Sequence, residues 1–362
     1  MDVSVPVSDP RDLRGEGQDV RVPGRLRSWL IRTGLLLVVF LGVFSVAEMG
    51  LRLLGHRPWR VTDLKIRVDP GGKLFQTHPT LGYNHLPEQY QITLSKGYSF
   101  TVTHGADTLR ITHRQHDEAD NKDCRPIWIF GCSITHGWSV NDHETYPWVL
   151  QEKLLDREVI NFGVSGYGTI HSLIQLRKAL TERKPPEVAV IAYGALHDER
   201  NVFLRQRRKV VFSWNKLGPL EQPYGKLDDT GQLRTSMSEV VYAEFPLMRL
   251  SATIHFLEQG YNKFEALYAQ SHQVSAAIIR EFDELCRANN IPLVIAGITT
   301  EKLTGEMLDW CRQQGMTAMD LSVDVKQERY NNKPHDAHPS ALAHKEYASK
   351  LHAYLSGAGL VD

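Results

Sequence analysis

Serine, histidine and aspartate stand where they could together form a nucleophilic site. Ser133 follows the apolar run 127–130 and Gly131, so it lies just beyond the end of an expected buried strand. Open α/β sheets place their chemistry at that end of their strands. A serine hydroxyl is a weak nucleophile unless a base lies within hydrogen-bond reach. His338 is the candidate base, and Asp336 is the candidate that fixes the tautomer of its ring.

Each of these residues also has another interpretation. Ser133 could simply cap the helix that is expected after it. His335 competes with His338 as the base, and these two histidines could instead bind a metal if a third ligand lies close by. The histidines that could supply this ligand are His136, His143, His171, His197 and His344. The nucleophile is the preferred interpretation, because Ser133, Asp336 and His338 together fit its requirements.

Three sequence blocks resemble those of the SGNH/GDSL serine hydrolases. Phe-Gly-Cys-Ser at 130–133 resembles the first block of that family, with Cys132 where Asp is usual. Asn-Phe-Gly-Val-Ser-Gly-Tyr-Gly at 161–168 resembles the second block, and Asp-Ala-His-Pro-Ser at 336–340 resembles the last. The resemblance covers roughly residues 125–355. It implies a flavodoxin-like parallel sheet and a Ser-His-Asp triad that cleaves esters.

The resemblance also implies which groups stabilise the oxyanion. The backbone amide of Ser133 would be one donor, and the amide of Gly166, in the second block, would be another. The third donor of the family is an Asn, but Leu196 occupies its position here. His197 or Asn201 could replace it, or both could belong to a polar loop that bonds within itself. Without a third donor the enzyme would be slow or inactive, because one such donor contributes about 10²–10³ in rate.

Hydrophobic patterning predicts the elements that position these residues. Strands are expected at 127–130, 158–162, 188–193, 292–297 and 316–320, and helices at 144–155, 170–183, 274–289, 303–314 and 341–355. This alternation is typical of a parallel sheet covered by helices on both faces. We therefore expect an α/β catalytic domain with three α/β/α layers at 125–358. An irregular insertion is expected at about 204–265, with a helix at 245–257.

The chain before residue 125 is organised differently. Residues 1–28 lack an apolar period and predict a disordered tail. Residues 29–54 are apolar over the ~20 residues that a bilayer requires, so we expect a transmembrane anchor. A signal peptide cleaved near Ala47, or a buried core helix, would have a similar pattern. Residues 58–120 predict a small β-rich appendage, with strands at 90–94, 98–102 and 108–112.

Composition excludes few classes of protein. Among 362 residues, 42 Lys and Arg balance 42 Asp and Glu, so the charge favours no nucleic-acid partner. Cys124, Cys132, Cys286 and Cys311 lack the paired spacing of a zinc site. Cys124 and Cys132 could form a disulfide in an oxidising compartment, or all four could be reduced packing residues. No cofactor is expected.

Together these patterns predict a single-pass membrane protein whose extracytoplasmic domain is an esterase or deacetylase. Its expected substrate is an acylated glycan or a lipid ester. An O-acyltransferase would use the same triad, with a hydroxyl in place of water. A metal-dependent hydrolase and an inactive SGNH-like domain that binds a glycan or a partner remain as alternatives, and Leu196 favours the last of these.

Overall fold

The computed structural model describes residues 24–60, 66–113, 125–212, 217 and 220–361. The chain divides into two compact units. The first consists of residues 1–60 and 245–257, and the second of residues 61–244 and 258–362. The expected tail lies outside the described residues up to position 23, whereas residues 24–28 are helical.

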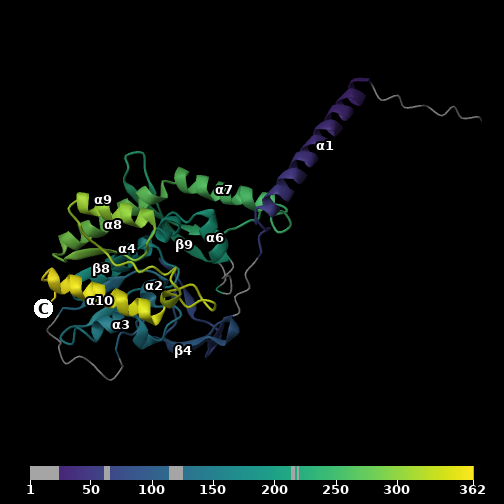
Figure 1. Ribbon diagram of the computed structural model, residues 1–362. Coiled ribbons are helices and arrows are strands. Elements are labelled where there is room, and N and C mark those ends of the chain that lie inside the picture. The colour runs from purple at the N-terminus through teal and green to yellow at the C-terminus, as the bar shows by residue number, and fades with distance from the viewer. Residues whose placement is uncertain (1–23, 61–65, 114–124, 213–216, 218–219, 362) are drawn as a thin grey trace, which may run out of the picture. The chain divides into compact units, whose positions relative to one another are not determined.

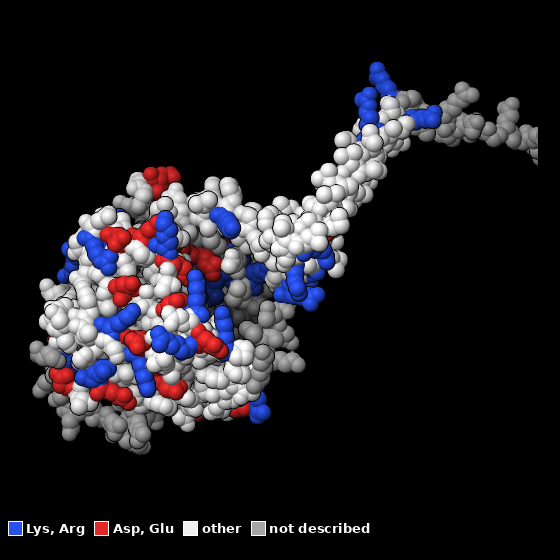
Figure 2. Space-filling model, viewed as in Figure 1, with Lys and Arg blue, Asp and Glu red and all other residues white. Residues whose placement is uncertain are grey.

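The first unit contains helix α1 (Gly24–Leu53) (Figure 1). It begins five residues before the predicted anchor, because Arg25, Leu26 and Arg27 are strong helix formers. The span Arg25–Leu53 has a mean hydropathy of 2.3, and none of its most apolar window is buried. Figure 2 shows this helix as a largely uncharged surface. The exposed apolar surface contradicts a buried core helix, while a membrane span and a signal sequence both fit.

Helix α7 (Ala252–Tyr268) begins later than the predicted helix at 245–257. Its start is fixed within the first unit by Glu48, a residue of α1. The Glu48 carboxylate accepts hydrogen bonds from the amides of Ala252 and Thr253, both at 2.9 Å, and from the Ser251 hydroxyl at 2.7 Å. A capping carboxylate of this kind satisfies amides that have no partner inside the helix. Sequence patterning could not detect this cap, because Glu48 lies about 200 residues earlier.

The second unit is built on a five-stranded parallel sheet in the order β12-β11-β8-β6-β7. These strands are β6 (Ile127–Phe130), β7 (Val159–Asn161), β8 (Val188–Tyr193), β11 (Leu293–Gly297) and β12 (Thr317–Asp320). All five predicted strands are thus present within one residue of their expected limits, and the parallel α/β fold is confirmed. Their carboxyl ends share one edge of the sheet, where Ser133 begins the segment after β6.

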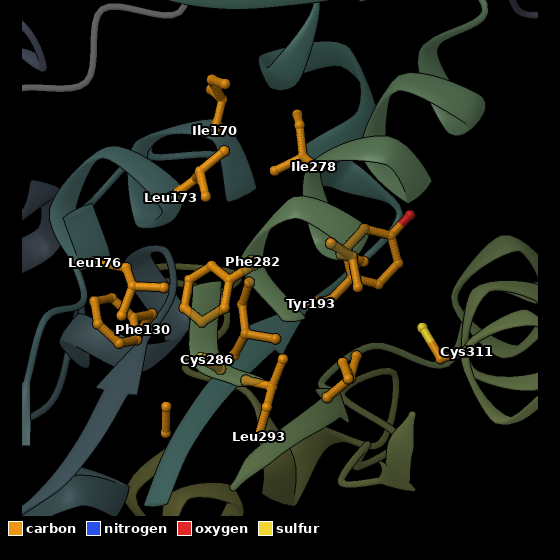
Figure 3. Packing of buried hydrophobic residues seen from close by; sticks show 14 of the residues in the cluster. Phe130, Ile170, Leu173, Leu176, Tyr193, Ile278, Phe282, Cys286, Leu293 and Cys311 are labelled. Carbon is orange, nitrogen blue, oxygen red and sulfur yellow. The ribbon is translucent and has the colours of Figure 1, made fainter. Parts of the chain in front are cut away.

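Alternate residues of the central strands point to opposite faces, as the pleat requires. Trp128 and Phe130 pack on one side against α4 (Thr169–Glu182), α8 (Ser271–Ala288) and α9 (Lys302–Gln313), as Figure 3 shows for Phe130 with Leu176 and Phe282. Ile127 and Ile129 pack on the other side against α3 (Tyr146–Gln151) and α10 (Ala341–Gly357). The domain therefore has the predicted three layers. Helix α3 is shorter than predicted, because Asp142–Glu144 is a separate 3₁₀ turn.

The β-rich segment belongs to the same compact unit as the large sheet. Strands β1 (Arg67–Asp69), β4 (Glu88–Thr93) and β5 (Ser99–His104) form an antiparallel sheet, and β2 (Phe75–His78) pairs with β3 (Gly82–His85). The strand predicted at 108–112 is wrong: Arg110 forms only isolated bridges, with His104 and Asn161. Its side chain turns inward and bonds to a neighbouring loop, which breaks the alternation that the sequence suggested.

The insertion is more regular than expected. The basic run at 205–209 lies in α6 (Arg205–Phe212), and β9 (Glu221–Leu227) and β10 (Leu233–Glu239) form a hairpin. Gly225 of β9 packs against Val274 of α8, so the hairpin gains its apolar contacts from the catalytic domain. The absence of a clear period in the sequence reflects this dependence on a distant partner.

Candidate active site

Ser133 is the first residue of the short helix α2 (Ser133–His136), directly after β6. Gly131 permits the tight turn between them. A Cβ at this position would lie 2.1 Å from Thr135 Oγ1 and 2.8 Å from Thr135 Cβ. Cys132 is buried and free, and it packs in the core beside α3 and α10. The serine, which remains 8% exposed, is therefore the nucleophile candidate of this turn.

The last block brings its aspartate and histidine to Ser133. His338 Nε2 lies 2.9 Å from Ser133 Oγ, and His338 Nδ1 lies 2.6 Å from Asp336 Oδ1. Because a carboxylate can only accept, Nδ1 carries the proton and the Nε2 lone pair faces the serine hydroxyl. His335, the competing base, instead stacks on Tyr98 with ring centroids 5.2 Å apart.

Asp336 is held as a carboxylate. Burial raises its pKa, but the side chain and backbone amide of His338 and the side chain of Trp138 donate hydrogen bonds to it, and the net result is a pKa below the usual value. The carboxylate is therefore charged at neutral pH and can stabilise an imidazolium at His338.

The loop after α2 that contains Ser139 positions Asp336 and His338. Sequence patterning did not predict this role of the loop. Ser139 has a φ of +65° and donates from Oγ to Asp336 Oδ1 at 3.3 Å. Asn332 Nδ2 contacts both Ser139 O at 3.0 Å and Ser139 Oγ at 2.9 Å. The amide of Asp336 in turn donates to Asn332 O at 3.1 Å. The segments that carry the nucleophile and the base are thus bonded directly to each other.

Arg110 anchors the same loop from the β-rich segment. Its side chain is fully buried, and Nε donates to Asp142 Oδ1 at 2.9 Å. Its two terminal nitrogens donate to backbone carbonyls, namely those of Thr101, His136, Gly137 and Val140. One guanidinium thereby ties the loop to β5. Neither the apolar pattern nor any motif identifies Arg110 as part of the site.

The second block lies against α2. Asn161 Nδ2 donates to Thr135 O at 3.0 Å, and a Cβ at Gly163 would lie 2.4 Å from the His136 amide nitrogen. Gly166 has a φ of +88°, which favours glycine. Among the described residues, no acceptor bonds to the amides of Ser133 and Gly166. Both amides are therefore available as oxyanion donors.

Of the two candidates for a third donor, Asn201 has both of its side-chain polar atoms engaged elsewhere, and His197 has one ring nitrogen engaged, whereas its Nε2 has no partner among the described residues. Asn201 Oδ1 accepts from the Ile170 amide at 2.9 Å, and its Nδ2 donates to Ser275 Oγ at 2.8 Å. His197 is buried, and its Nδ1 pairs with Thr169 Oγ1 at 3.2 Å. Asn201 is thus a structural link between α4 and α8 rather than a free donor. Leu196, at the family's Asn position, packs against the apolar core beside α10.

Within the described ranges, one group of side chains has the composition of a metal site, and it differs from the predicted set. The ring nitrogens of His85, His104 and His136 lie within 4.8 Å of one another. However, the His85 and His104 rings stack 3.9 Å apart at an interplanar angle of 9°, which directs their in-plane lone pairs into separate planes. The nearby Arg110 charge also disfavours a cation. The arrangement fits a neutral buried stack better than a ligand set.

The remaining histidines of the predicted metal set are dispersed. The Nδ1 atoms of His171 and His344 accept hydrogen bonds from the amides of Gly168 and Tyr146. Burial lowers the pKa of both rings to about 3, so they are neutral at physiological pH. His143 lines a cavity of about 750 Å³ together with Trp148 and Glu152, and none of the triad candidates lines that cavity.

The cysteines are buried packing residues where they are described. Cys132, Cys286 and Cys311 are free, and Cys124 lies outside the described residues. Burial raises the pKa of Cys286 and Cys311 to about 12, so neither is a thiolate at neutral pH.

Comparison with known proteins gives matches of structure only. No family model matches the chain, and no curated protein does. One similar structure is a putative lipolytic protein of the G-D-S-L family from Desulfitobacterium hafniense (14% identity, 63% of this chain and 98% of that chain, TM-score 0.35). A second is the psychrotrophic esterase EstA from Pseudoalteromonas (13% identity, 65% and 98%, TM-score 0.38). A third is AlinE4, an SGNH-hydrolase family esterase (16% identity, 66% and 97%, TM-score 0.33). By their descriptions, these three solved structures are a lipolytic protein of the G-D-S-L family and two esterases, one of them of the SGNH-hydrolase family.

Proposed function

We propose that this chain is a serine ester hydrolase that acts through an acyl-enzyme on Ser133. The observation that supports it best is the continuous hydrogen-bonded series from Ser133 Oγ through His338 to Asp336, with separations of 2.9 and 2.6 Å. Each member has the partner that its proposed role requires, and the series begins at the carboxyl end of a parallel strand.

The proposed reaction has two halves. In the first, Ser133 Oγ attacks the ester carbonyl carbon while His338 Nε2 takes the hydroxyl proton, and the oxyanion forms beside the Ser133 and Gly166 amides. The C–O bond to the leaving alcohol then breaks, and His338 returns the proton to that oxygen. In the second half, water repeats the attack on the acyl-enzyme with His338 again as the base, which releases the acid and restores Ser133.

A hydroxyl that replaces water in the second half would make the protein an O-acyltransferase with the same residues. We propose an acylated glycan or a lipid ester as the substrate, reached from a membrane to which residues 29–54 attach the chain. The catalytic unit would then face the extracytoplasmic side, where such esters occur. This placement rests on the apolar span Arg25–Leu53, which also fits a signal sequence.

The test is labelling of the detergent-solubilised full chain by a fluorophosphonate probe, which reacts with activated serines. We expect the wild type to be labelled, Ser133→Ala to lose the label, and Ser356→Ala to keep it. Ser356 is a suitable control because it is exposed on α10. A folded wild-type chain that takes no label would contradict the proposal and favour the inactive, binding alternative.

A second assay separates hydrolase from acyltransferase. The acyl-enzyme would be formed from a chromogenic acetyl ester, and its breakdown would be followed with and without a soluble sugar acceptor. Release of free acetate at an unchanged rate indicates a hydrolase. Transfer of most of the acetyl group to the sugar at low acceptor concentration indicates a transferase.

A further inference from the structure

The peptide group between Ser165 and Gly166 carries the second proposed oxyanion donor, and a buried tyrosine holds it. Tyr83, from β3, donates its phenolic hydrogen to Ser165 O at 2.9 Å. A trans peptide is planar, and its C=O and N–H point in opposite directions. The bond from Tyr83 to the Ser165 carbonyl therefore fixes the direction of the Gly166 N–H.

A buried arginine holds the next carbonyl of the same turn. Arg207, from α6, donates from Nη2 to Gly166 O at 2.7 Å and contacts the Tyr83 hydroxyl at 3.3 Å. Tyr83 is fully buried and Arg207 is 5% exposed. Gly166 has the largest conformational freedom of any residue type, so two fixed carbonyls flanking it remove freedom that its sequence would otherwise allow.

Tyr167, the residue after Gly166, adds further contacts that hold this turn. Tyr167 OH donates to Tyr83 O, and the Tyr83 and Tyr167 rings meet edge to face with centroids 5.4 Å apart. Arg200 Nη1 donates to Tyr167 O at 2.9 Å. Burial raises the pKa of Tyr83 more strongly than the Arg207 charge lowers it, so its phenol stays protonated and remains a donor.

We propose that Tyr83 and Arg207 are positioning residues for the oxyanion site, a role that rests on the proposed function. They act through the Ser165–Gly166 peptide and do not touch the substrate. Both come from segments outside the large sheet, Tyr83 from the β-rich segment and Arg207 from the insertion. These two segments therefore complete the active site, rather than forming an appendage and a surface loop.

Tyr83→Phe is the decisive variant, because it removes one hydroxyl and keeps the ring. We expect kcat to fall by about 10–10², less than the loss of a whole donor, because the Gly166 N–H remains but is misdirected. KM should change little, since the hydrogen bond to the oxyanion strengthens in the transition state. The pH profile of kcat/KM should be unchanged, because His338 and Asp336 are untouched, and fluorophosphonate labelling should slow in parallel with kcat.

The matched control is Tyr90→Phe. Tyr90 is a buried tyrosine of β4, in the same part of the chain, and its hydroxyl contacts only a backbone carbonyl, Leu86 O at 3.4 Å. In the described part of the chain, Tyr90 makes no hydrogen bond or ring contact with the Ser165–Gly166 turn. A purely structural role predicts similar losses of thermal stability and no loss of kcat in both variants, and this result would overturn the proposal.

Arg207→Lys keeps the positive charge but replaces the planar guanidinium, which has several fixed donors, with an ammonium group. We expect this variant to lower kcat with KM unchanged.

A crystal structure of the Tyr83→Phe protein separates this proposal from the proposed function. If the wild type neither hydrolyses esters nor takes the label, the proposed function fails. The orientation of the Ser165–Gly166 peptide still shows whether Tyr83 positions that peptide. A rotated peptide in Tyr83→Phe supports the positioning role. A peptide in the same orientation as in the wild type overturns it.

Discussion

His338 Nε2 lies 2.9 Å from Ser133 Oγ, although the two residues are 205 positions apart in the chain. The parallel sheet accounts for this. Ser133 follows the carboxyl end of β6, and His338 stands just before α10, which packs beside α3 on one face of the same sheet. Their meeting depends on the sheet order, which places β6 between β8, the central strand, and β7 at the edge.

Asp336→Asn should lower kcat by about 10⁴, the size of the effect in serine proteases, while leaving the fold intact. The amide would donate to His338 Nδ1 and so favour the tautomer with the proton on Nε2, which cannot accept the Ser133 proton. Hydrolysis of a chromogenic acetyl ester measures this, with Asp324→Asn on an exposed loop as the control. Activity within tenfold of the wild type would exclude Asp336 as the residue that fixes the tautomer.

Asn201→Ala should destabilise the protein without slowing the chemistry of its folded fraction. The change leaves the Ile170 amide without its acceptor and Ser275 without its donor, at a cost of about 1–3 kcal/mol in the free energy of unfolding. Urea denaturation and kcat per folded molecule measure the two effects separately. A loss of 10² or more in kcat at unchanged stability would instead make Asn201 an oxyanion donor.

Arg110→Met should lower both stability and activity. It removes the charged partner of the Asp142 carboxylate, which keeps only its hydrogen bonds from Thr103, and it removes a donor from several buried carbonyls. Breaking a buried ion pair in this way costs about 3–5 kcal/mol. The loop that carries Ser139 then loses its anchor, so Asp336 is held less firmly.

Arg177→Met provides the comparison for Arg110→Met. Arg177 pairs with Glu281 at a partly exposed site, where such pairs contribute about 0–1 kcal/mol. Thermal unfolding of both variants, followed by circular dichroism, measures the difference. Equal shifts in the two variants would contradict the anchoring role of Arg110.

His272 should make the stability depend on pH. A hydrogen bond from its Nδ1 to Asp198 Oδ2 (2.8 Å) outweighs burial and raises its pKa above 6.5. The folded state holds the His272 proton more tightly than the unfolded state. The contribution of His272 to the free energy of unfolding is therefore full below pH 6.5 and is lost as the pH rises through the folded pKa. The side chain is 28% exposed, so the effect is small and weakens with salt.

Urea denaturation at pH 5.5 and at pH 8.5 tests the His272 prediction, with His272→Gln as the reference. The wild type should lose more stability than the variant between these two values. The same pH dependence in both proteins would show that Asp198 and His272 do not interact in the folded state.

The sequence by itself determined the large sheet and two of its site-bearing segments. Apolar runs such as 127–130 and the amphipathic pattern at 274–289 specify buried strands and packed helices locally, so their limits were predicted closely. Ser133 follows such a strand, and Asp336 and His338 precede a predicted helix. The requirement of a serine nucleophile for a base, together with the three sequence blocks, selected them.

Only the tertiary structure decided which polar side chains act on those residues. This applies to Arg110, Asn332, Tyr83 and Arg207. Each gains its role from acceptor groups on other segments, and the pattern of its own segment does not indicate those groups. The same holds for Asn201, whose hydrogen-bond partners Ile170 and Ser275 were set by the packing of α4 against α8. A buried polar group needs a hydrogen-bond partner, and the tertiary structure determines which group this is. Hydrophobic periodicity in the sequence does not identify that partner.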